Sequence, residues 1–212
     1  EMQIFVPIQE HNEFAFDIVL LAERLATDST YIEMAQKAYD RTPDPYTIVY
    51  SLACFERSLI SSNSKFDKYV LEGDKAAFTP VEKRGYELFI SDSLKCNTCH
   101  SGFMLTDFSF QNNGIYEIYE DPGRARLTLN DTDCGKFKVP SLRNIAFTGP
   151  YMHDGSFKNL EEIIDHYASG GKNHENQSRK IQGFSIFEED KIALVQFLQC
   201  LTDSVFIGNE VY

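Results

Sequence analysis

The residues best suited to chemistry in this sequence are Cys96-Asn97-Thr98-Cys99-His100, its one C-x-x-C-H motif. The two cysteine thiols of such a motif can add across haem vinyl groups, because two intervening residues place both sulfurs along one porphyrin edge. His100 then lies under the iron and supplies the proximal nitrogen. Such a motif seldom arises by chance in a chain with five cysteines in 212 residues. It therefore predicts one haem c, bound covalently through Cys96 and Cys99 with His100 as iron ligand.

Two other uses of paired cysteines are less compatible with this sequence. A structural zinc site needs two further Cys or His ligands, normally as a second close pair. Cys54, Cys134 and Cys200 each stand alone, and no H-x₃₋₅-H pair is present. A redox dithiol is the remaining alternative, but it gives no reason for the adjoining histidine. Cys54 and Cys200 fall in helical patterns and are predicted to be buried, whereas Cys134 has no assigned role.

The composition is that of a globular protein with an acidic surface. Apolar residues make up 42% of the chain and the net charge is −12. This charge argues against nucleic acid and anionic membrane surfaces as partners, and it suits a partner with a basic patch. No run of 18 apolar residues occurs, so no membrane span is predicted. No signal peptide starts at Glu1. Since haem is generally attached after export, we expect a mature periplasmic or otherwise exported product.

Apolar spacing predicts several helices before the motif. After a loop-like stretch over residues 1–12, interrupted by Pro7, helical spacing appears over residues 13–26, 31–39 and 46–60. Residues 61–78 have the composition of a connector. We therefore assign residues 1–78 to a helical segment and linker that belongs to, or packs on, another domain.

The helices that flank the motif predict a cytochrome c arrangement. Thr79 and Glu82 form a capping box that opens a helix running to about residue 90, directly before Cys96. Gly85, in the middle of this helix, predicts a close crossing with the last helix. That last helix is predicted over residues 186–201, with its own capping box in Ser185 and Glu188.

The segment between the motif and the last helix is predicted to wrap the haem. Residues 101–150 show little regular structure and are punctuated by Gly and Pro. Asn159 opens one further short helix that ends near Gly170. The predicted fold is therefore all-α, with a cytochrome c-like domain over residues 79–212.

Several stretches together resemble the C-terminal part of the bacterial di-haem cytochrome c peroxidases. Their relatives include the di-haem oxygenase that matures a tryptophan-derived quinone cofactor. The resemblance extends over essentially the whole chain. It is carried by Phe55-Glu56-Arg57-Ser58-Leu59-Ile60-Ser61, Thr79-Pro80-Val81-Glu82-Lys83-Arg84-Gly85, residues 96–102, Gly135-Lys136-Phe137-Lys138-Val139-Pro140-Ser141-Leu142-Arg143-Asn144 and Pro150-Tyr151-Met152-His153-Asp154-Gly155.

The resemblance implies an oxidoreductase built from two cytochrome c domains. The N-terminal haem of the family meets hydrogen peroxide, and the C-terminal haem receives electrons and passes them on. This sequence holds only the second C-x-x-C-H, and the first would lie before Glu1. We therefore expect the electron-relay part of a peroxidase that reduces hydrogen peroxide to water, with 212 residues that alone turn over peroxide poorly.

The implied partners are a small electron-donor cytochrome c or cupredoxin, and a homodimer is one expected assembly. Two other functions stay open at this point. One is a mono-haem electron-transfer module without catalysis. The other is a di-haem oxidase or oxygenase that acts through high-valent iron.

The distal iron ligand is predicted to be Tyr167, with Met152 as the alternative. Generic cytochromes c use a downstream methionine, which Met152 fits loosely. Typical peroxidases of the family place their methionine ligand fourteen residues after the histidine that corresponds to His153, and this position is Tyr167 here. The cofactor-maturing relative has a tyrosine ligand at that place. A buried tyrosine that packs on the haem without binding iron is the other possibility.

The resemblance also assigns catalytic residues near the start of the chain. Family members carry a Gln and a Glu ten residues apart, around a Pro-Ile step, on the loop over the peroxidatic haem. Gln3, Pro7-Ile8 and Glu13 reproduce this spacing. The Glu is suited to move a proton between the peroxide oxygens, and the Gln to hydrogen-bond the peroxide. A loop residue and a helix-start residue are the ordinary roles for the same side chains.

Two further groups of residues follow from the family pattern. Calcium in these enzymes is bound between the domains by backbone carbonyls that correspond to Thr148 and Pro150, completed by waters and an upstream ligand. A sharp loop without an ion is the alternative. Haem propionates need cationic or hydrogen-bonding partners. The candidates for the haem surroundings are Arg124, Arg126, Lys138, Arg143 and His153.

Overall fold

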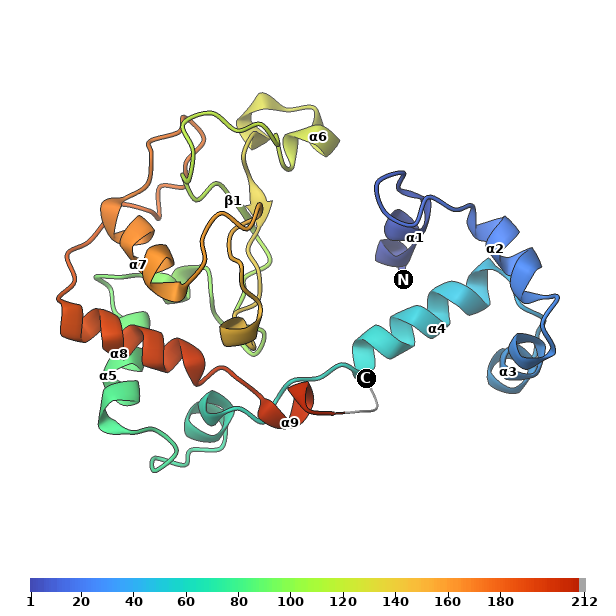
Figure 1. The fold of residues 1–212 in the computed structure, drawn as a ribbon, viewed down its shortest axis with the longest axis horizontal. Coiled ribbons are helices and arrows are strands. Elements are labelled where there is room, and N and C mark those ends of the chain that lie inside the picture. Colours follow the sequence, from blue (N-terminus) through green and yellow to red (C-terminus); the bar gives the residue numbers. More distant parts are fainter. Residues whose placement is uncertain (210–212) are drawn as a thin grey trace. The chain divides into compact units, whose positions relative to one another are not determined.

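The computed structural model describes residues 1–209, which form two compact units divided between Ile60 and Ser61. Helices are the main regular structure of both units and strands are few, which confirms that part of the predicted fold class (Figure 1). No helix among the described residues is long and apolar enough to cross a membrane.

The N-terminal unit begins with a helix where a loop was predicted. Helix α1, Met2–Gln9, contains Pro7 in its interior. Proline there removes one backbone hydrogen bond, which disfavours a helix. However, Ile4 and Ile8 are both buried in a core shared with α2 and α4, so tertiary packing outweighs the local cost.

The next three helices match the sequence prediction to within a few residues at their ends. They are α2 (Ile18–Leu25), α3 (Ser29–Tyr39) and α4 (Pro45–Ser58). Helix α2 begins later than predicted, because Asp17 accepts hydrogen bonds from the backbone N–H groups of Val19 and Leu20 and so caps the helix there. Helix α4 opens on a capping box formed by Asp44 and Thr47.

Residues 61–78, which we assigned to the N-terminal segment, pack in the C-terminal unit. The carboxylate of Asp203 accepts hydrogen bonds from the backbone N–H groups of Ser62 and Asn63 at 2.9 Å each. Phe66 belongs to the core of the C-terminal unit. Asp67, in the π-helical turn η1 (Asp67–Leu71), forms a bidentate ion pair with Arg143. The boundary between the units therefore lies at residue 60, because this segment is anchored by side chains far along the chain.

Helices α5 (Pro80–Phe89) and α8 (Glu188–Gln199) cross closely, as Gly85 predicted. A Cβ atom at Gly85 would collide with the backbone carbonyl of Ala193 and with Cβ of Phe197. The capping box of α5 is present as predicted. The predicted capping box of α8 is not, because α8 begins at Glu188 after Phe187, and the Phe187 side chain cannot cap.

The long segment between the motif and α7 is almost free of regular structure, as predicted. Its short strands β1 (Phe110–Gln111) and β2 (Phe137–Lys138) pair antiparallel, with Gln111 opposite Phe137. Helix α6 (Ala125–Thr128) is a single turn. Helix α7 (Leu160–Ser169) is capped by Asn159 and ends at Gly170, whose φ of 84° lies in the left-handed region. The short α9 (Ser204–Ile207) follows α8.

Candidate haem site

The C-terminal unit encloses an apolar cavity of about 400 Å³. This volume lies in the range of small-molecule and cofactor sites. The wall combines α5, α7 and α8 with the irregular segments between them. Its apolar part consists of Phe89, Leu94, Val139, Pro140, Leu142, Ile145, Leu160, Ile163, Ile164, Ile181, Phe184, Leu194 and Leu198.

The C-x-x-C-H motif forms one wall of this cavity. A 3₁₀ turn, η2 (Cys96–Thr98), is closed by hydrogen bonds from the N–H groups of Cys99 and His100 to the Cys96 carbonyl. This tight turn brings both thiols and the imidazole to the cavity lining. Both cysteines are free thiols, and burial raises the pKa of Cys96 to about 11. Two unpaired thiols beside an apolar cavity are what covalent haem attachment requires.

His100 is held as a neutral ligand. Burial lowers its pKa from the ordinary value, so the uncharged imidazole predominates. Its Nδ1 atom lies 3.2 Å from the carbonyl oxygen of Leu105. A hydrogen bond from Nδ1–H to a backbone carbonyl assigns the lone pair to Nε2, which is the usual arrangement for a metal-binding histidine.

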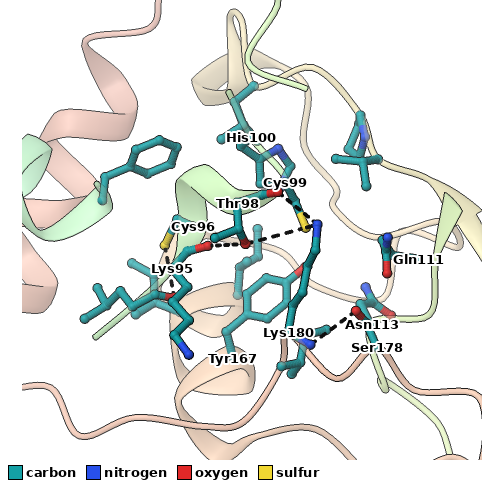
Figure 2. Close-up of a pocket in the computed structure, with 18 of the residues that line it drawn as sticks. Lys95, Cys96, Thr98, Cys99, His100, Gln111, Asn113, Tyr167, Ser178 and Lys180 are labelled. Atoms are coloured by element: carbon teal, nitrogen blue, oxygen red, sulfur yellow. Dashed lines mark hydrogen bonds between the residues drawn. The ribbon is translucent and has the colours of Figure 1, made fainter. Parts of the chain in front are cut away.

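Tyr167 enters the same cavity from α7. It lies three residues after the buried Ile164 and seven after the buried Leu160, so helical periodicity places all three on one face. Figure 2 shows the Tyr167 ring reaching toward the Cys96–His100 segment. Burial raises the pKa of Tyr167 to about 12. Met152, the alternative ligand, also lines the cavity.

The polar residues of the cavity wall that the sequence prediction missed include Gln111, Asn113 and Lys180. The ammonium group of Lys180 donates to the Thr98 carbonyl at 2.9 Å and lies 3.5 Å from Sγ of Cys99. Asn113 contacts Met152 through Nδ2. The sequence Asn112-Asn113-Gly114 indicates only a turn, so no sequence signal places Asn113 in a site.

Of the five residues predicted to surround the haem, Lys138 and His153 line the cavity. His153 stacks on Phe137 with ring centroids 3.9 Å apart. Arg124 lies over the Phe110 ring and Arg126 is exposed, and neither is part of the wall.

Arg143 also lies outside the wall and is buried in an ion pair, so its predicted contact with a haem propionate stays a prediction. Its guanidinium is buried and binds Asp67 at 2.8 and 3.0 Å, while its Nε–H donates to the Phe103 carbonyl. Because a planar guanidinium pairs well with a carboxylate, Arg143 fixes η1 to the segment after the motif. Its role in this structure is an ion pair within the unit.

The remaining predicted residues are not part of the cavity lining. Gln3 on α1 and Glu13 in the following turn are both exposed in the N-terminal unit. The turn folds back on α1 through a hydrogen bond from the Phe14 N–H to the Pro7 carbonyl. Thr148 and Pro150 are exposed after the 3₁₀ turn η4 (Ile145–Phe147).

The cavity does not have the ligand set of a zinc site. Within residues 1–209, no three His, Cys, Asp or Glu side chains are grouped so that they could hold a metal ion. The two thiols, the neutral imidazole and the apolar walls instead fit a c-type haem. The site therefore defines the C-terminal unit as a c-type cytochrome domain.

Comparisons with known proteins identify a family within this class. The family model described as di-haem cytochrome c peroxidase matches residues 1–76. The methylamine utilization protein MauG of Methylophilus methylotrophus is 34% identical over 205 residues, which cover 95% of this chain and 60% of the relative. Cytochrome c551 peroxidase of Nitrosomonas europaea is also 34% identical, with coverages of 92% and 56%.

A solved structure of a related protein is also similar to this chain. The crystal structure of a MauG-like protein associated with microbial copper homeostasis has a TM-score of 0.88 and 28% identity, covering 99% of this chain and 70% of that chain. The chain belongs to the di-haem cytochrome c peroxidase family, which includes MauG, as the sequence resemblance predicted. It spans about 60% of the length of the first curated relatives.

Proposed function

We propose that this chain carries the electron-relay haem of a di-haem peroxidase that reduces hydrogen peroxide to water with electrons from a small redox protein. The observation that best supports the proposal is that one apolar cavity is lined by Cys96, Cys99, His100 and Tyr167. The family supplies the oxidoreductase class. Beyond that class, we propose three details. They are the relay role, hydrogen peroxide as substrate, and a small cytochrome c or cupredoxin as donor.

The residues of the cavity would hold haem c in a defined way. Cys96 and Cys99 would form the thioether bonds, and Nε2 of His100 would bind the iron. When bound, the haem supplies a one-electron centre whose potential depends on its axial ligands. The apolar walls would pack against the porphyrin, and Lys138 and His153 are the lining residues proposed for its polar edge. Because such haems are attached after export, we propose a periplasmic or otherwise exported location.

Tyr167 is the proposed distal ligand, in preference to Met152. Tyrosinate stabilises ferric iron and lowers the potential, whereas methionine raises it. We expect the ferric protein to lack a Met–Fe(III) charge-transfer band and Tyr167→Phe to alter its spectrum more than Met152→Leu. A larger change in Met152→Leu would reject this assignment.

Gln3 and Glu13 are proposed to serve a second haem, supplied by polypeptide outside these 212 residues. The family match over residues 1–76 includes both positions and supports this role. The exposed Glu13 carboxylate would move a proton between the peroxide oxygens, and the Gln3 amide would hydrogen-bond the peroxide. Calcium bound by the carbonyls of Thr148 and Pro150, and a homodimer, stay predictions.

Oxidation of another substrate, as an alternative to peroxide reduction, is the second candidate function. It is favoured by a specific observation, since a tyrosine rather than a methionine lines the cavity at position 167 and two of the relatives are MauG proteins. A low-potential relay haem would accept electrons poorly from an ordinary small cytochrome. The third possibility, electron transfer without catalysis, predicts no peroxide turnover in any context.

Turnover measurements separate these functions. The 212-residue chain and a version joined to the family's N-terminal haem domain would be compared for peroxide consumption with a reduced cytochrome c or cupredoxin. We expect the longer protein to be active and the shorter to accept electrons but consume little peroxide. Full activity in the shorter chain, or none in the longer, would contradict the proposed relay role.

A further inference from the structure

The acidic and basic side chains that line the cavity all carry the same sign of charge. They are Lys95, Lys138 and Lys180, and within residues 1–209 no aspartate or glutamate lines the cavity. The chain as a whole has 20 lysines and arginines against 32 aspartates and glutamates, with a net charge of −12. The cavity is therefore locally basic in an acidic protein, which is opposite to the sign that the composition suggests for a contact surface.

Two of these lysines lie beside the C-x-x-C-H motif. Lys95 directly precedes Cys96, and its carbonyl oxygen accepts a hydrogen bond of 2.7 Å from the Thr98 hydroxyl. The Lys180 ammonium donates to the Thr98 carbonyl at 2.9 Å and lies 3.5 Å from Sγ of Cys99 (Figure 2). Lys95, Thr98 and Lys180 all line the cavity and all are exposed, so the cavity reaches the surface here. We call these three residues the motif edge.

The carboxylates of a bound haem do not account for the lysines of the motif edge. The two vinyl groups and the two propionates of haem lie on opposite sides of the porphyrin. Cys96 and Cys99 would bind the vinyl side, and Lys180 lies next to Sγ of Cys99, so it belongs to the vinyl side. The lining lysine proposed for the propionate side is Lys138. The positive charge of the motif edge is therefore left to face solvent or a partner.

Asp107 offsets part of this positive charge. Among the described residues, it is the carboxylate that forms an ion pair with a lysine of the motif edge, at 3.5 Å from the Lys180 ammonium. The same carboxylate accepts hydrogen bonds from the N–H and the hydroxyl of Ser109 at 2.9 and 2.7 Å. Lys95 then gives the motif edge its net positive charge. At physiological ionic strength, exposed charges more than about 8 Å away are largely screened, so groups beside the motif set the potential that a docked partner meets.

We infer that the motif edge is the docking surface for a small electron-transfer protein that carries carboxylates around its redox centre. Docking there brings the partner's redox centre next to the covalently bound side of the haem. One electron then passes between the partner and the haem iron, which changes between its ferric and ferrous states, and no proton or group is transferred. Complementary charge raises the association rate by about 10–10³-fold. This docking role rests on the proposed electron-relay function and adds the chemistry of the partner.

The test is stopped-flow electron transfer from the reduced, haem-loaded chain to two oxidised probes, an acidic cupredoxin and a basic small cytochrome c. At an ionic strength of about 0.15 M, Lys95→Glu/Lys180→Glu should lower the second-order rate constant with the acidic cupredoxin by about tenfold or more. The rate constant with the basic cytochrome c should rise or stay the same. A change in haem potential would instead move both rate constants in the same direction.

The matched control is Lys83→Glu/Lys158→Glu. It makes the same change in net charge at two exposed lysines outside the cavity lining. Because their charges are screened from the motif edge, it should change the rate constant with the acidic cupredoxin by about twofold or less. The single variant Lys95→Glu keeps the contacts of Lys180 with Thr98 and Asp107, so it tests the same surface should reversal at Lys180 prevent haem attachment.

Unchanged rate constants with the acidic cupredoxin in both motif-edge variants would overturn the inference. An equal fall in the control, or a fall with both probes, would overturn it as well. The parent protein separates this failure from failure of the proposed function. If the parent holds no covalent haem or passes electrons to neither probe, the proposed function fails. If the parent passes electrons and reversal of the lysines has no effect, only the docking surface is wrong.

Discussion

The two units of this protein differ in how they present the residues assigned to chemistry. In the C-terminal unit, residues from positions 96 to 167 converge on one apolar cavity. In the N-terminal unit, Gln3 and Glu13 are exposed, and large apolar side chains such as Met2, Phe14 and Met34 are at least 60% exposed. Its small core consists of Ile4, Ile8, Ile18, Ala22, Ile48, Val49 and Ala53.

This difference indicates that the two units contribute to function in different ways. The C-terminal unit contains the ligands and the walls of its site, so it can be tested by itself. In the N-terminal unit, the proposed catalytic residues Gln3 and Glu13 are exposed. Under the function proposed above, they serve a haem that another part of the protein supplies.

The largest effect is expected for Glu13→Gln in a version that includes the N-terminal haem domain. Removing a positioned general acid–base group lowers turnover by about 10²–10⁴-fold. The spectrum of the haem at Cys96 and Cys99 should not change, because Glu13 belongs to the other unit. Steady-state peroxide consumption and absorption spectra measure the two effects.

The matched control for this variant is Glu23→Gln, which removes an exposed carboxylate of the same unit. It should retain normal turnover. Equal activity in the Glu13 and Glu23 variants would show that Glu13 is an ordinary exposed carboxylate. The catalytic role assigned to it would then be wrong.

A smaller effect is expected when the buried ion pair of the C-terminal unit is broken. Asp67→Asn leaves the Arg143 charge without its carboxylate partner, which costs about 3–5 kcal/mol in the free energy of unfolding. Asp190→Asn removes the carboxylate that pairs with the half-exposed Arg84 and should cost about 0–1 kcal/mol. Chemical denaturation of the haem-loaded proteins gives both values. Equal losses would contradict the structural role of Asp67.

The same pair predicts a pH dependence. Burial opposes ionisation of Asp67, but hydrogen bonds from Arg143 and Ser64 outweigh it and hold its pKa below the ordinary value. A lowered carboxyl pKa contributes stability that is present above the unfolded value, about 3.9, and is lost as the pH falls through the folded value. Below about pH 4, the free energy of unfolding should therefore fall more steeply with decreasing pH in the parent than in Asp67→Asn.

The smallest effect is expected at the crossing of α5 and α8. Gly85→Ala places a methyl group against the Ala193 backbone, and overpacking of this kind costs about 1–3 kcal/mol. The gain in helix propensity, about 1 kcal/mol, offsets part of this cost. The exposed Lys83→Ala is the control and should change stability by about 0.5 kcal/mol or less. A stabilised Gly85→Ala would show that the helices separate easily.

The parts of the site that local sequence encodes could be predicted. The C-x-x-C-H spacing determines which side chains reach the haem, and Gly85 marks the crossing because only a small residue fits there. The helix that carries Tyr167 has its own cap in Asn159. The motif and the cap depend on residues that are close in the chain, and Gly85 marks its contact with the distant α8 by its own small size.

The parts that depend on distant partners could not be predicted. Arg143 forms a buried ion pair that the sequence did not indicate, because its partner Asp67 lies 76 positions away. Asn113 reaches the cavity because β1 pairs with β2 and because His166 anchors its carbonyl. Pro7 stays in α1 because Ile4 and Ile8 are buried. Tertiary packing decided each of these cases.

The C-terminal unit is proposed to hold one covalent haem through Cys96 and Cys99. This is tested by the mass of the denatured, exported 212-residue chain, together with its pyridine haemochrome spectrum. We expect a mass increase of one haem that survives denaturation and a c-type haemochrome spectrum. Haem that extracts freely into acidic organic solvent, or one equivalent of zinc in place of haem, would show that the unit does not hold haem c.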